Sequence, residues 1–161
     1  MSVIDRAADR IPPAAPWIHF QGPLSEDPIP LSVPEAMAVV MVASMLADGA
    51  RSAEESARLT DVLSTSRMLR QAAGVSSPDV VARAVALLDK HGSGAMLEAC
   101  ARTLPPDLRD SAFAIASDLV LADGRVEERE RVYLDQLQKV LGVDDALALK
   151  IVEVMVIKNR A

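Results

Sequence analysis

Apolar residues after Pro34 recur at the three- and four-residue spacing of α-helices, and no segment alternates convincingly with the period of two that marks a strand. Capping boxes at Ser32/Glu35 and Ser52/Glu55 predict two helix starts, and glycines or prolines predict most of the helix ends. We therefore predict an all-α bundle of about seven helices. The helical segments are expected over residues 33–47, 52–63, 67–73, 78–91, 95–103, 105–122, 125–141 and 145–158.

One motif occurs twice at the ends of these predicted helices. Leu-Ala-Asp-Gly at Leu46–Gly49 returns at Leu121–Gly124, each time after an uncharged apolar run. Each aspartate is followed seven residues later by a glutamate. The four carboxylates are Asp48 and Glu55 in the first copy and Asp123 and Glu130 in the second. This repetition predicts an internal duplication with a pseudo-twofold axis.

The repeated carboxylates are expected to converge on one acidic site where the two copies meet. The glycine permits the left-handed turn that brings the second helix of each pair back against the first. Asp118 adds a fifth carboxylate, and it is the single charge between Ser111 and Ala122, so we expect it to be partly buried. A buried carboxylate cluster is unfavourable unless protons or a cation neutralise it. All-oxygen ligands favour Ca²⁺, Mg²⁺ or Mn²⁺.

Neither copy is a complete EF-hand loop. If Asp123 is position 5 of such a loop, Glu130 is position 12, but positions 1 and 3 are Leu119 and Leu121 rather than acidic residues. The competing interpretation is that the motif shapes helix ends, with glutamate in a first helical turn interacting favourably with the helix dipole. The protein would then be a helical interaction module that binds no metal.

Composition restricts the possible partners. The chain has 161 residues, half of them apolar but 2% aromatic, which suits closely packed helices. Its net charge of −6 argues against nucleic acid or an anionic membrane as the main partner. The longest uncharged apolar runs are too short to span a bilayer, and no signal peptide is evident. We expect a cytoplasmic protein that acts through protein partners.

Residues 1–31 are expected to form an extended arm, and residues 32–161 a helical domain. Seven of the ten prolines lie between Pro12 and Pro34, where they disfavour a regular helix or sheet. Trp17, Ile18 and Phe20 lie within the arm, which either packs on the protein's own helices or docks on a partner. Met37, Met41 and Met45 form a stripe on the first predicted helix, which we interpret as core filler rather than a binding groove.

Residue types that support other chemistry are scarce. Cys100 cannot form an internal disulfide because it is the single cysteine, and it is expected to be a small core residue. His19 and His91 lack ligand spacing to Cys100, so a zinc site is not expected. No nucleophile elbow or phosphate-binding loop is present. The sequence does not predict an enzyme.

The second copy and its surroundings resemble the tellurite-resistance TerB family. The similar stretches are residues 114–130, 133–137 and 150–160, with Ala-Asp-Gly and a glutamate seven residues after the aspartate as the family's mark. The copy at Asp48 fits the family's two-repeat plan, and the resemblance covers residues 32–160. It implies an all-helical fold, a metal-binding acidic site at the five carboxylates, and association with tellurite and chemical-stress resistance. Ala43, where the second repeat has Asp118, leaves the first repeat one carboxylate short.

Overall fold

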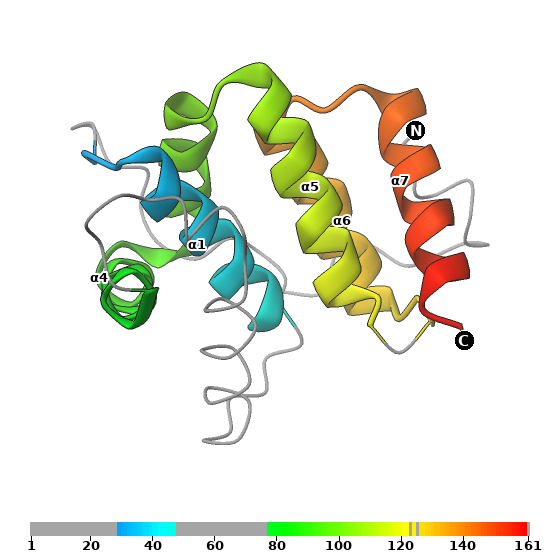
Figure 1. Cartoon of the computed structure of the whole chain (residues 1–161), viewed down its shortest axis with the longest axis horizontal. Coiled ribbons are helices and arrows are strands. Elements are labelled where there is room, and N and C mark those ends of the chain that lie inside the picture. The colour runs from blue at the N-terminus through cyan, green and yellow to red at the C-terminus, as the bar shows by residue number, and fades with distance from the viewer. Residues whose placement is uncertain (1–28, 48–76, 123, 125, 161) are drawn as a thin grey trace.

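The computed structural model of the chain describes residues 29–47, 77–122, 124 and 126–160. Across these residues the chain forms five helices and no strand (Figure 1). They are α1 (Val33–Met45), α4 (Ser77–Thr103), α5 (Pro106–Val120), α6 (Glu128–Leu141) and α7 (Asp145–Lys158). The all-α fold class is therefore confirmed. The helices predicted over 52–63 and 67–73, and the proline-rich arm except for its last residues, lie outside the described residues, so the helix count and the internal repeat stay predictions.

Helix α1 is buried along most of its length. It packs against α4 on one side and α5 on the other (Figure 1). Nine consecutive residues, 36–44, are buried, as expected for a helix that is apolar on all sides. The predicted capping box at its start is confirmed, because the Glu35 amide donates to Ser32 Oγ at 3.3 Å and the Ser32 amide donates to Glu35 Oε2 at 2.9 Å. The helix ends at Met45, two residues before the predicted end.

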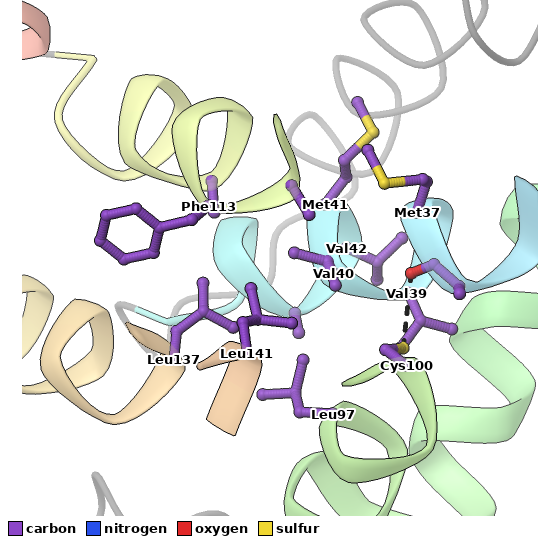
Figure 2. Close-up of a cluster of buried hydrophobic side chains, with 14 of the residues drawn as sticks. Met37, Val39, Val40, Met41, Val42, Leu97, Cys100, Phe113, Leu137 and Leu141 are labelled. Atoms are coloured by element: carbon purple, nitrogen blue, oxygen red, sulfur yellow. Dashed lines mark hydrogen bonds between the residues drawn. The ribbon is translucent and has the colours of Figure 1, made fainter. Parts of the chain in front are cut away.

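The core around α1 is built by side chains from three other helices. Leu97 of α4, Phe113 of α5 and Leu137 of α6 belong to the same buried cluster as α1 (Figure 2). Met37 and Met41 are buried in the same cluster, which confirms core filling for two members of the methionine stripe. The few aromatic residues therefore leave a core of closely packed aliphatic side chains.

The glycines and the last cap act largely as predicted. Gly92 has φ 81 and ψ 159, a non-helical conformation that divides α4 into two helical segments at a sharp kink, where the sequence predicts a break between helices over 78–91 and 95–103. Gly142 adopts the left-handed conformation at the end of α6, with φ 68. Asp144 caps α7, because its Oδ2 accepts hydrogen bonds from the amides of Ala146 and Leu147 at 3.1 and 3.2 Å.

The connection between α5 and α6 is longer than predicted. Helix α5 ends at Val120 instead of residue 122, and α6 begins at Glu128 rather than directly after Gly124. The difference arises because Leu121 already caps α5 and Glu127 takes the N-cap position of α6. The connection therefore spans residues 121–127, and the second Leu-Ala-Asp-Gly motif lies entirely within it.

Helix α7 lies at the edge of the bundle and packs mainly on α5 (Figure 1). Its residues Ala148 and Val152 are buried, whereas Leu147, Val154 and Ile157 are exposed. Its first turn is attached to α6, because Gln138 Nε2 donates to Asp145 Oδ1 at 2.6 Å. No helix of the described part combines the length and apolar character that crossing a membrane requires.

Candidate functional site at the connection between α5 and α6

The second motif forms a tight turn after α5. The Leu121 amide donates to the Ser117 carbonyl at 2.9 Å, and the Gly124 amide donates to the Leu121 carbonyl at 2.9 Å. Gly124 has φ 74, the left-handed conformation that the sequence predicted for this glycine. A Cβ atom on Gly124 would lie 2.6 Å from the carbonyl oxygen of Asn159. The turn therefore needs glycine both for its backbone conformation and for the close approach of α7.

Asp118 lies in the last turn of α5 with 38% of its side chain exposed, as the sequence predicted for a partly buried carboxylate. Lys158 Nζ donates to Asp118 Oδ1 and Oδ2 at 2.8 and 3.0 Å, and Asn159 Nδ2 donates to Oδ1 at 3.0 Å. Burial raises the pKa of the Asp118 carboxyl, but these hydrogen bonds and the lysine charge lower the pKa more, so it lies below the ordinary 3.8. Asp118 is therefore ionised at neutral pH.

Lys158 and Asn159 were not among the predicted site residues. The sequence predicted neutralisation of a carboxylate cluster by protons or a cation, whereas the charge that faces Asp118 comes from Lys158 at the end of a different helix. The sequence did set these residues apart, because residues 158–160 are the end of the C-terminal stretch that resembles the family. That resemblance indicated the family but gave no reason to pair these side chains with Asp118.

Glu130 lies in the first turn of α6 and takes part in a helix cap. Its Oε2 accepts a hydrogen bond from the Glu127 amide at 3.1 Å. When the two copies of the motif are aligned, Glu127 and Glu130 correspond to Ser52 and Glu55, for which the sequence predicts a capping box. Glu130 thus has the capping role that the competing interpretation requires, and its predicted role as a metal ligand is not tested by this contact.

The end of α1 is joined to α6 by a buried hydrogen bond. Ser44 Oγ donates to the Val40 carbonyl at 2.7 Å and lies 3.1 Å from Tyr133 Oη. Because the Ser44 hydrogen is used by Val40, the Tyr133 hydroxyl is the donor to Ser44. Burial raises the pKa of Tyr133, so its hydroxyl stays protonated at neutral pH and can act as this donor. The contact lies two residues before the first motif and three residues after Glu130.

The predicted five-carboxylate site is described in part. Asp118 and Glu130 are placed on either side of the α5–α6 connection, whereas Asp48, Glu55 and Asp123 lie outside the described residues. Within the part of the chain that is described, no three His, Cys, Asp or Glu side chains gather in a way that could hold a metal ion. The shared acidic site therefore stays a prediction.

The comparison with protein-family models gives one match. Residues 34–151 match the family model described as tellurite resistance protein TerB. The chain belongs to the TerB family. No curated protein and no solved structure matches the chain significantly.

The cysteine of this TerB-family chain is a core residue, as predicted. Cys100 is fully buried on α4, and its Sγ donates to the Ala36 carbonyl at 3.4 Å (Figure 2). Burial raises the pKa of the thiol to about 12. Since the thiolate is the reactive form, the native protein offers a poor site for thiol chemistry.

We expect Cys100 in the native protein to react with an aromatic disulfide reagent at pH 8 more than about a hundredfold slower than in denaturant, because opening of the core is rare. Absorbance of the released thiol, followed in buffer and in guanidinium chloride, measures both rates. Comparable rates in the two conditions would show that the thiol is accessible in the folded protein.

Proposed function

We propose that this TerB-family protein binds a divalent cation through carboxylates at and after its two Leu-Ala-Asp-Gly motifs and acts through protein partners in tellurite or related chemical-stress resistance. The proposed role is cation binding rather than catalysis, and the proposed setting is the cytoplasm. The family supports the association with tellurite resistance. Exposed apolar side chains on α7, such as Val154 and Ile157, offer contact area for a partner.

The observation that carries the proposal is the hydrogen bond between Ser44 and Tyr133. This hydrogen bond holds the end of α1 against α6. Ser44 lies just before the first motif, and Tyr133 lies just after Glu130, the glutamate that follows the second motif. A shared site requires the two motifs to approach each other in this way. The contact therefore supports convergence of the first-repeat pair Asp48/Glu55 with the second-repeat carboxylates.

The donor chemistry fits a hard cation. Asp118 carries a negative charge in a partly buried position and already attracts a positively charged group, the Lys158 ammonium. Carboxylate oxygens are preferred by Ca²⁺, Mg²⁺ and Mn²⁺ over soft metals. The proposed ligands are Asp48, Glu55, Asp118, Asp123 and Glu130. A bound cation would supply the positive charge that such a cluster needs for stability.

Titration calorimetry of metal-free protein with Ca²⁺, Mg²⁺, Mn²⁺ and Zn²⁺ tests the proposal. A cation that binds the folded state alone raises the free energy of unfolding, by about 2.7 kcal/mol at a hundredfold excess over Kd. Asp118→Asn is expected to reduce this gain strongly. Asp110→Asn is the matched control, because it removes the same charge from the same helix about two turns away. Equal cation effects in both variants would exclude Asp118 as a ligand.

A second candidate is a helical interaction module in which the acidic motifs shape helix ends without metal. The Glu127–Glu130 hydrogen bond favours it, because it gives Glu130 a capping role. This candidate predicts no heat of cation binding and no cation-dependent shift in melting temperature. It also predicts that Asp118→Asn lowers stability by at most about 1 kcal/mol, through loss of a half-exposed ion pair, whether or not cations are present.

A further inference from the structure

The last turn of α7 rests on the same residues that flank the second motif. Lys158 and Asn159 both donate to Asp118 at the end of α5. The backbone of Asn159 also lies close to Gly124, because a Cβ atom on Gly124 would be 2.6 Å from the Asn159 carbonyl oxygen. Side-chain and backbone contacts thus hold this turn against the connection between α5 and α6.

The rest of α7 is less firmly attached at this end. Val154 and Ile157 are exposed, the latter by 68%, and the fully buried residues Ala148 and Val152 precede them, whereas Met155 and Val156 near the end are partly buried against the core. The contact between Gln138 and Asp145 holds the opposite end of α7 on α6. The polar contacts of Asp118 therefore add to a partial apolar packing in positioning the last turn.

We propose that Lys158 is a built-in competitor for the cation, so that cation binding at Asp118 releases the last turn of α7. This inference rests on the proposed cation binding. Lys158 Nζ lies within 3.0 Å of both oxygens of Asp118, where a second positive charge would be repelled. Ca²⁺ and Mg²⁺ bind carboxylate oxygens at about 2.0–2.6 Å, so a cation that binds both oxygens of Asp118 takes the place that the ammonium occupies.

Release of Lys158 would also free Asn159, which shares Oδ1 of Asp118 with it. The contact between the Asn159 carbonyl and Gly124 would then lack its side-chain anchors. Cation binding in the α5–α6 connection is thereby converted into a change at the C-terminal end of α7. In this proposal the end of α7 is docked while Lys158 holds Asp118 and is released when a cation takes its place.

The test compares the full-length wild type with Lys158→Met, which removes the ammonium but keeps an unbranched side chain. Lys150→Met is the matched control, because it removes the same charge from an exposed position on α7. Mn²⁺ and Ca²⁺ are titrated into each metal-free protein, and hydrogen exchange of residues 156–159 is measured with and without the cation.

We expect Lys158→Met to bind the cation about two- to fivefold more tightly than Lys150→Met, the range that corresponds to the usual strength of an exposed ion pair. In the wild type, the cation should accelerate exchange of residues 156–159. In metal-free Lys158→Met these amides should already exchange faster than in the wild type.

Two results would overturn the inference, and they are distinguishable. If the wild type binds the cation but Lys158→Met binds it no more tightly than Lys150→Met, the competition is wrong and the proposed cation binding stands. If neither the wild type nor Lys158→Met binds either cation, the proposed function fails, and the competition fails with it. Binding by Lys158→Met alone would support the competition, with Lys158 excluding the cation from the wild type.

Discussion

Gly124→Ala is expected to lower the free energy of unfolding by about 2–5 kcal/mol, through two separate effects. At φ 74 an alanine is strained, by about 1–2 kcal/mol. Its Cβ would also meet the Asn159 carbonyl oxygen at 2.6 Å, and this backbone atom can move only if the end of α7 moves. Overpacking of this kind adds about 1–3 kcal/mol.

Gly142→Ala separates the two effects. Gly142 has a similar left-handed conformation, with φ 68, but nothing lies within 4 Å of a Cβ placed there. It should therefore lose about 1–2 kcal/mol, from backbone strain alone. Urea unfolding followed by circular dichroism measures both variants. Equal losses would mean that the last turn of α7 does not rest on Gly124 in solution.

Phe113→Ala is expected to lower the free energy of unfolding by about 3–5 kcal/mol. The Phe113 side chain of α5 is fully buried and belongs to the same hydrophobic cluster as the residues of α1. Its removal would leave a cavity between α5, α1 and α6 that aliphatic neighbours fill poorly, and few other aromatic residues are present to compensate.

Ile157→Ala provides the control for that measurement. It also removes apolar atoms, but Ile157 is 68% exposed on α7, so its loss should change stability by less than about 0.5 kcal/mol. Both variants are compared by urea unfolding at one temperature. A loss below about 1 kcal/mol for Phe113→Ala would show that α5 is not packed on the core as described.

The carboxylate of Asp118 shows how far sequence reasoning reaches at the candidate site. A single charge in an apolar run predicted partial burial of Asp118, and the structure confirms it. The neutralising group could not be predicted, because Lys158 is distant in the sequence and meets Asp118 only after α7 has packed on α5. The hydrogen bond between Ser44 and Tyr133 could not be predicted for the same reason, because it joins two helices that are far apart in the chain.

The sequence by itself determined the features that depend on near neighbours in the chain. Capping at Ser32 and Asp144, the breaks at Gly92 and Gly142, and the helical class all follow from contacts within about four residues or from one residue's backbone freedom. The repeated motif likewise indicated the TerB family without any coordinates. Tertiary structure alone decided that Lys158 faces Asp118, that the end of α7 lies close to Gly124, and that Tyr133 of α6 hydrogen-bonds to Ser44 of α1. These contacts depend on how helices distant in sequence pack, and periodicity along one helix predicts that it has a buried face but not which side chains will meet that face.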